Sequence, residues 1–320
     1  MEHYERADDY YYRSIISQEK DLKNHLFNIM MNSGYLREDL KYCRQLLRLY
    51  MNDEYLANLL LSQSIQDNIV VLHAFHAGLM EAVNQIIEPM AGEIRLQWWS
   101  DVLNGKRNEE AAGHPLARSL LYLIKQQPVA VDQETIKTML NTKIKAHVVE
   151  VHRQSMKSLS MLENWFVETH SSLFQLSAMM NGSKVNSELL NASRHSGIAQ
   201  GLMRILINLA RYRSMKRIFV PLDILNEYDL NTEDFLQSID QRHEKLIIAL
   251  IQLTTDHYKK ALIEIRNLDR SSRKIFCILS LIPLYLRIFQ ESPRETLTGI
   301  QKFPLQFCRQ WVLLLSFISW

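Results

Sequence analysis

The stretch from Gly197 to Pro221, GIAQGLMRILINLARYRSMKRIFVP, is the part of the chain that decides the fold. At about 100° of rotation per helical residue, its small and polar residues fall on one narrow stripe, and most of the remaining circumference is apolar. The stripe consists of Gly197, Gly201, Arg204, Asn208 and Arg211. This pattern predicts a buried helix.

The two arginines of this stripe need partners, because desolvating an unpaired charge costs several kcal/mol. We therefore expect the stripe to face a polar cavity or oppositely charged groups. The alternative is that Arg204 and Arg211 extend to solvent at the end of the helix. Gly197 and Gly201 favour the cavity, because a residue without a side chain lets another group approach the backbone closely.

The composition indicates one helical domain. The 320 residues are 47% hydrophobic and 22% charged, which is enough apolar material for a substantial core. Only 9 residues are Gly and 7 are Pro, so turns are few and helices long. No segment alternates with a period of two for long enough to predict a strand. We expect a single all-α domain over residues 42–320, preceded by a polar N-terminal extension over residues 1–41.

The charge and the cysteine content indicate which partners and which cellular compartment to expect. The net charge of +2 is too balanced to favour nucleic acid as the main partner. Cys43, Cys277 and Cys308 are widely spaced, which indicates free thiols in a reducing, cytoplasmic compartment. The N-terminus lacks the apolar region of a secretory signal, and no apolar run is long enough to span a bilayer. The apolar end from Trp311 to Trp320 predicts core docking or, at most, peripheral contact with the inner membrane face.

A second buried helix is predicted from Ser64 to the residue before Pro89. Apolar residues almost encircle it. One face carries small residues in its first part and polar residues in its second part. That face carries Ala74, Ala77, Gly78, Glu81, Asn84 and Gln85. His73 and His76 also lie on it, but no Cys, His or carboxylate set has the spacing of metal ligands, so we expect no metal there.

Local signals predict several helix ends. Starts are predicted at Asp53, at Pro115 and at a capping box of Ser160 with Glu163, ends at Asn104–Gly105 and Asn181–Gly182, and a kink at Pro283.

Arg95 lies next to two tryptophans in the segment IRLQWWSDVL. Trp98 and Trp99 in this pattern favour a core position over a stacking platform, and Arg95 is a candidate ligand-binding residue. Generic catalytic signatures are missing, since the chain has no GxGxxG, GxxxxGK[ST], GxSxG or HExxH. Short motifs alone therefore predict no reaction.

Five segments together resemble the squalene and phytoene synthase family. In order between about Tyr42 and Trp311 they are IVVLHAF, GEIRLQWWSDVLNG, GHPLARSL, ETHSSLFQL and GIAQGLMRILINLARYRSMKRIFVPLDIL. More closely, they resemble a bacterial branch that is similar to the mitochondrial complex I assembly factor of the same fold. The resemblance implies a helical bundle of the isoprenoid synthase type with a large central cavity.

The resemblance also implies a place for the chemistry. Active members of the family carry an aspartate-rich motif on each of two facing helices, and these motifs hold the Mg²⁺ that ionises prenyl diphosphates. Alignment puts the first motif at Met80, Glu81 and Asn84, and the second at Arg204, Asn208, Arg211 and Tyr212. Only Glu81 keeps a carboxylate, and the two arginines would repel Mg²⁺.

The resemblance therefore favours a non-catalytic factor without a cofactor, which binds an isoprenoid, a lipid or a protein partner, in assembly of a respiratory complex. The alternatives are an active head-to-head prenyltransferase whose arginines bind the diphosphate directly, with Mg²⁺ only in that case, and a purely structural scaffold.

The site expectations follow from this alignment. No catalytic or metal-ligating residue is expected, and Glu81 is expected within direct or one-water reach of Arg204 or Arg211. The small residues of the two helices are expected to leave room for an apolar ligand. The expected ligand-binding residues are Glu81, Asn84, Arg95, Arg204, Asn208 and Arg211.

Overall fold

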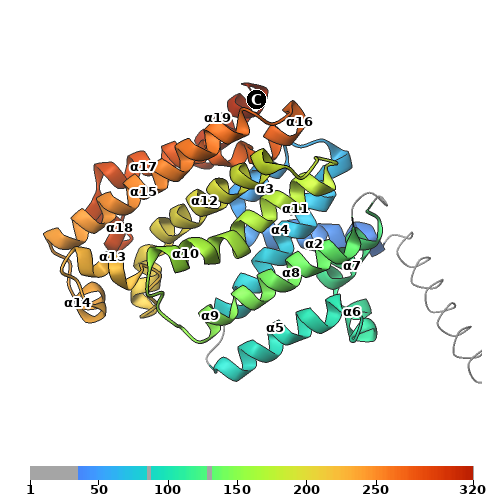
Figure 1. Ribbon diagram of the computed structural model, residues 1–320, viewed down its shortest axis with the longest axis horizontal. Helices are drawn as coiled ribbons and strands as arrows, with labels where there is room; N and C mark the ends of the chain where they lie inside the picture. The colour runs from blue at the N-terminus through green and yellow to red at the C-terminus, as the bar shows by residue number, and fades with distance from the viewer. Residues whose placement is uncertain (1–34, 85–87, 128–131, 320) are drawn as a thin grey trace, which may run out of the picture.

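The computed structural model describes residues 35–84, 88–127 and 132–319, and all regular elements in these ranges are helical. Figure 1 shows them as a bundle of roughly aligned long helices with shorter helices at its ends. The elements of the first half are α2 (Tyr35–Tyr50), α3 (Asn52–Asn58), α4 (Gln63–Asn84), α5 (Pro89–Leu103), α6 (Asn108–Gly113), α7 (Pro115–Lys125), α8 (Gln133–Ala146) and α9 (Val148–Val151).

The second half contains the stretch that decides the fold. Its elements are α10 (Leu159–Phe166), the π-helix η1 (Val167–Ser171), α11 (Ser172–Met180), α12 (Ser187–Ser214), α13 (Leu222–Glu227), α14 (Thr232–Gln237), α15 (Gln241–Ile265), α16 (Arg270–Arg273), the 3₁₀-helix η2 (Lys274–Leu281), α17 (Ile282–Glu291), α18 (Pro293–Thr298) and α19 (Gln306–Ser319). No helix in the described ranges is both long enough and apolar enough to cross a bilayer.

Helix α12 is the central helix, as its sequence pattern predicts. It begins at the N-cap Asn186, whose side chain accepts a hydrogen bond from Leu189 N at 2.9 Å. Its two sides pack against α15 and against the continuous α10–η1–α11 helix, between which it lies in Figure 1. The apolar rows of α12 are buried, so burial of these rows fixes its place in the bundle.

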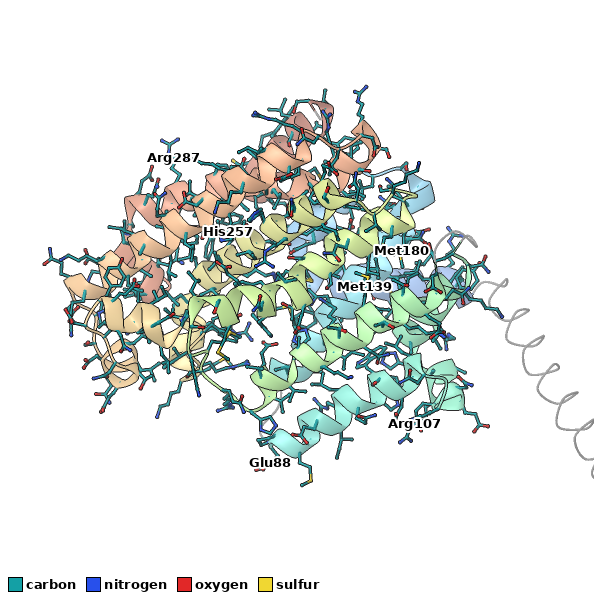
Figure 2. All side chains as sticks on the ribbon, in the orientation of Figure 1. Glu88, Arg107, Met139, Met180, His257 and Arg287 are labelled. Atoms are coloured by element: carbon teal, nitrogen blue, oxygen red, sulfur yellow. The ribbon has the colours of Figure 1, made fainter. Side chains whose placement is uncertain are left out.

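Two groups of buried apolar side chains form the core. One surrounds α12, α15, η2 and α17, and the other joins α2, α4, α5, α7 and α8. Met180 of α11 belongs to the second group and Met139 of α8 packs against it, whereas Arg287 of α17 projects into solvent (Figure 2). Helix α4 borders both groups, so it lies between the two halves of the bundle.

The predicted domain boundary at residue 41 falls inside α2. Asp39, in the predicted extension, is buried and receives a hydrogen bond from Arg118 Nε of α7 at 2.7 Å. Residues 35–41 are therefore part of the packed bundle, because this buried ion pair ties them to α7. Residues 1–34 of the predicted extension lie outside the described residues.

The predicted helix ends are correct where a backbone requirement sets them. Pro115 is the first residue of α7, and Gly105 and Gly182 follow helix ends with φ of 74° and 79°. Two predicted starts are wrong, because the N-cap residues are Met51 and Ser158 and not Asp53 and Ser160. Pro283 lies in the first turn of α17, where no N–H is needed, at the change from 3₁₀ to α geometry.

Candidate functional site

The two helices that the alignment singles out approach one another at Met80 and Arg204. Nη1 of Arg204 on α12 lies 3.8 Å from the sulfur of Met80 on α4. Both positions belong to the aspartate-rich motifs by alignment, so the expected facing of the motif helices is confirmed at this point. The groups that meet there are a thioether and a guanidinium instead of two carboxylates.

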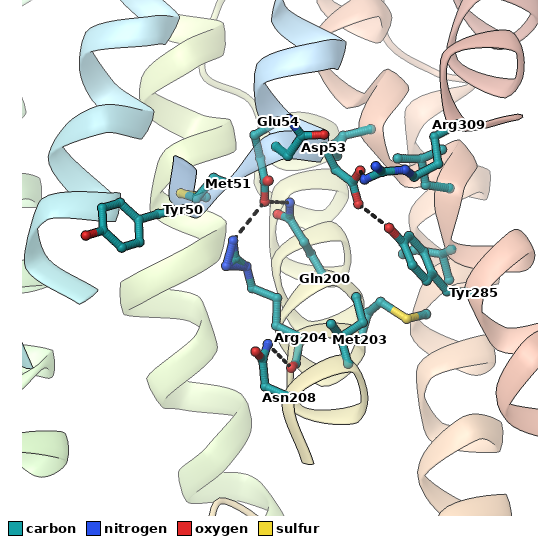
Figure 3. Close-up of a pocket in the computed structure, with 15 residues that line it drawn as sticks. Tyr50, Met51, Asp53, Glu54, Gln200, Met203, Arg204, Asn208, Tyr285 and Arg309 are labelled. Atoms are coloured by element: carbon teal, nitrogen blue, oxygen red, sulfur yellow. Dashed lines mark hydrogen bonds and ion pairs between the residues drawn. The ribbon is translucent and has the colours of Figure 1, made fainter. Parts of the chain in front are cut away.

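Arg204 has an acidic partner that the sequence pattern did not predict. Nη2 of Arg204 lies 3.4 Å from Oε1 of Glu54 on α3, and the same oxygen accepts a hydrogen bond from Gln200 Nε2 at 3.0 Å. Figure 3 shows these three side chains pointing toward one another. Burial raises the pKa of Glu54, and the charge of Arg204 acts in the opposite direction. The signal in the sequence was the second of two adjacent carboxylates in the first turn of α3, directly before the apolar residues of this helix.

A second ion pair lies beside the first. Asp53 accepts a hydrogen bond from the Tyr285 hydroxyl at 2.6 Å and forms an ion pair with Arg309 of α19. The predicted role of Asp53 as an N-cap is wrong, because its carboxylate points across to α17 and α19. Adjacent acids on α3 thus hold this short helix to α12 on one side and to α17 and α19 on the other.

These side chains line a half-open pocket of about 250 Å³, shown in Figure 3. Its polar lining includes the two ion pairs together with Gln200 and Asn208. Its apolar lining includes Met203, Ile207, Ile278, Leu281 and Ile282. The pocket therefore combines paired charges with an apolar surface.

The second motif contributes only part of its predicted residues to this pocket. Asn208 lines it and donates its amide N–H to the carbonyl of Arg204 at 2.9 Å. Arg211 is exposed near the end of α12, so the prediction that it lines a cavity is wrong. Arg211 follows the alternative prediction, since a long side chain near a helix end reaches water.

Glu81 and Arg95 lie in a different place. Both line an open groove of about 490 Å³ between α2, α4, α5 and α7, together with Trp98 and Trp99. The Glu81 carboxylate accepts a hydrogen bond from the Tyr50 hydroxyl at 2.5 Å, and Arg95 Nη1 donates to the carbonyl of Ala82 at 3.5 Å. Trp99 is buried in the core, as predicted.

The predicted bridge from Glu81 to Arg204 is wrong. Met80 occupies the side of α4 that faces Arg204, and one further residue turns Glu81 by about 100°, toward α2 and Tyr50. The acidic partner of Arg204 comes instead from α3. Asn84, the remaining predicted residue of the first motif, ends α4, and its side chain lies outside the described part.

The space beside the two glycines of the stripe is filled by protein atoms, so no ligand can lie there. A Cβ atom on Gly197 would collide with the backbone and side chain of Ser171, and one on Gly201 would collide with the ring of Phe166. Both contacts come from the α10–η1–α11 helix. The prediction that these small residues leave room for an apolar ligand is wrong at both positions, because that helix fills the space.

Between α4 and α12 the interior holds a cavity of only about 20 Å³. It is lined by His76, His147 and His170, and within the described residues Nε2 of each of these has no hydrogen-bond partner. Burial and nearby cations lower the pKa of His76 and His170 well below the usual value, so both rings are neutral. The space is therefore far smaller than the large cavity that the resemblance implies.

The charges around this cavity do not suit a cation. Arg204 places a guanidinium at the lining, and the lining carboxylate of Glu150 already pairs with Arg217 and His147. In the described ranges, His, Cys, Asp and Glu form no cluster of three or more that could hold a metal ion. The residues that are present thus do not fit the Mg²⁺ of an active synthase, which needs carboxylate oxygens.

Comparison with known proteins identifies the family of this chain. The family model "Squalene/phytoene synthase" matches residues 47–308. The chain belongs to the squalene/phytoene synthase family. A solved dehydrosqualene synthase superposes with a TM-score of 0.70 over 89% of this chain and 96% of its own, at 13% identity. A squalene synthase from Alicyclobacillus acidocaldarius superposes with a TM-score of 0.64 over 81% and 95%, at 14% identity. Both likenesses show the all-α fold of these synthases.

Curated relatives of this chain are named as assembly factors and not as synthases. NADH dehydrogenase (ubiquinone) complex I, assembly factor 6 is 26% identical over 208 residues in Bos taurus and 25% identical over 207 residues in Homo sapiens. Each match covers 65% of this chain and 60% of the relative. This member of the squalene/phytoene synthase family has degenerate aspartate-rich motifs, because Met80, Arg204 and Asn208 stand where the alignment places motif residues.

Proposed function

We propose that this chain is a non-catalytic member of the squalene/phytoene synthase family that acts through a protein partner, as an assembly factor for a respiratory complex. The observation that carries the proposal is the ion pair between Glu54 and Arg204. It places a guanidinium, 3.4 Å from its carboxylate partner, at the point where the motif helices meet. A fixed cation there repels Mg²⁺, and without a metal a diphosphate stays a poor leaving group.

The available space supports the same proposal. The cavity between α4 and α12 has room for about one water molecule. The pocket of Figure 3, at about 250 Å³, is below the roughly 300 Å³ at which small-molecule sites begin. A head-to-head prenyltransferase has to hold two prenyl chains at once, and neither of these two spaces beside α12 is large enough for that. The larger groove of about 490 Å³ is lined by α2, α4, α5 and α7 and not by α12, so it does not bring the two motifs together.

The curated relatives support the choice of partner. Proteins named as assembly factor 6 of NADH dehydrogenase (ubiquinone) complex I match 65% of this chain. We infer a cytoplasmic protein that binds peripherally at the inner membrane face and contacts subunits of such a complex during its assembly.

Deletion of this chain in the organism that encodes it tests the proposal. We expect the level of assembled complex I, measured on blue native gels, to fall and to return when the wild-type chain is supplied. Active squalene synthase expressed in the same strain is the matched control and should not restore it. An unchanged level of assembled complex I in the deletion strain contradicts the assembly role.

A second candidate function is favoured by the arginines of the pocket. Nε of Arg204 and Nε of Arg309 are buried and have no hydrogen-bond partner within the described residues. An isoprenoid or lipid with an anionic head could place the head at these arginines and its chain along Met203 and Ile207. Each guanidinium already faces a carboxylate, so such a ligand would have to displace Glu54 or Asp53, and this makes it the weaker candidate.

A further inference from the structure

The C-terminal helix α19 is held to the bundle along one side only. Leu313 is fully buried, Arg309 forms the ion pair with Asp53, and the ring of Phe317 lies under the ammonium group of Lys274 at 4.6 Å. These contacts fix the rotation of the helix about its axis. The opposite side of α19 must therefore face outward.

That outward side is apolar. Phe307, Leu315 and Ile318 keep 62–64% of their surface exposed, and Trp311 and Leu314 are exposed as well. At about 100° per residue these five side chains fall within an arc of about 100°. The preceding segment adds Ile300, Phe303 and Leu305, which are also exposed. We call residues 300–318 with these eight exposed side chains the C-terminal apolar surface.

The charge of this surface has one sign. Residues 296–320 contain Lys302 and Arg309 but no Asp or Glu. Arg309 is paired with Asp53 on the side of α19 that contacts the bundle, so the basic groups at this surface are Lys302, which is exposed, and Lys274, which lies next to Phe317. An apolar strip with aromatic side chains and only basic charges matches the boundary between the headgroups and acyl chains of an anionic bilayer.

We propose that the C-terminal apolar surface binds an anionic lipid bilayer. The 14 residues of α19 extend about 21 Å, which is less than the roughly 30 Å of a hydrocarbon core, so the helix lies in the interface and does not cross it. This inference deepens the peripheral location proposed above by naming the surface and the lipid class. It does not depend on whether the chain is an enzyme or on which protein it assembles.

A membrane fits the charge of the surface better than a protein partner does. Protein interfaces carry a mixed polar rim around their apolar centre, whereas the charged residues beside this strip, Lys302 and Lys274, are basic. A strip of Phe, Trp, Leu and Ile with a basic residue at its start is the pattern of an interfacial helix. A second copy of the chain is the remaining occupant, and the experiments distinguish it.

Vesicle flotation of the full chain tests the proposal. We expect wild-type protein to float with phosphatidylcholine vesicles that contain phosphatidylglycerol, and to float less with phosphatidylcholine alone or at high salt. The triple variant Phe307→Ser, Trp311→Ser, Leu315→Ser should lose about tenfold or more in binding, because three apolar side chains no longer enter the bilayer. The matched control Ile248→Ser, Ile263→Ser removes two equally exposed side chains from α15 and should float like wild type.

A label on the wild-type chain gives a second measurement that needs no substitution. Cys308 is exposed in the first turn of α19, whereas Cys43 and Cys277 are buried and burial raises the pKa of both thiols to about 12. A thiol-reactive, environment-sensitive fluorophore should therefore attach at Cys308. We expect its emission to shift to shorter wavelength with anionic vesicles.

Three results would overturn the proposal. The first is flotation of the triple variant at the wild-type level while its thermal melting is unchanged. The second is the absence of both flotation and emission shift in the wild-type chain. This result overturns the proposal even if the triple variant does not fold. The third is a wild-type dimer that becomes a monomer in the triple variant without any vesicle binding, which assigns the surface to a second copy. None of these results bears on the level of assembled complex I, so the two proposals fail separately.

Discussion

Arg204 shows how one side chain changes what a site can hold. It occupies the line of α12 that the alignment assigns to metal binding, and its guanidinium lies within reach of Glu54 and Met80. A buried charge is stable only with a partner, so Glu54 and Arg204 depend on each other. The pair holds α3, α4 and α12 together at a point where active members of the family need carboxylates.

We expect Arg204→Met to lower the free energy of unfolding by about 3–5 kcal/mol, because the Glu54 carboxylate is left buried without its cation. The double variant Glu54→Gln, Arg204→Met should recover most of this loss, since no charge remains. Chemical denaturation of the wild type, the single variant and the double variant measures the free energy of unfolding of each. A single variant as stable as wild type would show that the pair does not stabilise the fold.

The same variant should be sensitive to pH. Burial already raises the pKa of Glu54 in the folded protein, and removal of Arg204 takes away the charge that opposes this shift. A carboxyl group whose pKa is raised on folding stabilises the folded state at low pH, and the stabilisation is lost as pH rises through the folded pKa. The deficit of Arg204→Met should therefore shrink from pH 7.5 to pH 5.5. A deficit that grows instead would contradict this assignment of Glu54.

Much of this local arrangement follows from the sequence, but the partner of Arg204 does not. The apolar circumference of α12 predicts that Arg204 is buried and needs a counter-charge. The counter-charge is present, and the Arg204 side chain is largely but not fully buried, with 15% of its surface exposed. The partner stands 150 positions earlier in the chain, on a short helix whose direction depends on packing in the whole bundle. The helical rotation between Met80 and Glu81 then decides which residue of α4 faces the site, and a sequence alignment does not show that rotation.

At the scale of elements, α12 is fitted to the α10–η1–α11 helix through its two glycines. The π-helix η1 ends at Ser171, which approaches Gly197, and Phe166, which directly precedes η1, covers Gly201. The helical spacing of the sequence predicts that both glycines lie on one line of α12. Their partner could not be predicted, because a stretch of polar residues such as ETHSS does not reveal that a π-helix will press its backbone against α12.

We expect Gly197→Ala and Gly201→Ala each to destabilise the protein by about 1–3 kcal/mol through overpacking. Gly197→Ala should cost more, because its Cβ meets backbone atoms of Ser171, which move less easily than the ring of Phe166. Gly113→Ala at the end of α6 is the control, since a Cβ there meets no atom within 4 Å. Thermal unfolding compares the three, and a neutral Gly197→Ala would contradict the packing described here.

At the scale of the whole molecule, the fold followed from the sequence and the interior did not. Scarce glycine and proline, apolar periodicity and the family resemblance predicted an all-α bundle, and the structure and its solved relatives confirm it. The size of the cavity depends on how Phe166, the buried histidines and Arg204 pack against one another. These contacts join segments far apart in the chain, so no local pattern records them.

The measurement that tests the central claim most directly is a prenyltransferase assay of the wild-type chain. Purified protein is incubated with farnesyl or geranylgeranyl diphosphate and Mg²⁺, next to an active dehydrosqualene synthase as positive control. We expect no squalene- or phytoene-type product above the level without enzyme, because the Arg204 guanidinium, paired with Glu54, stands at a position where the alignment expects a metal-binding motif residue. Product above that level, abolished by a chelator, would contradict it.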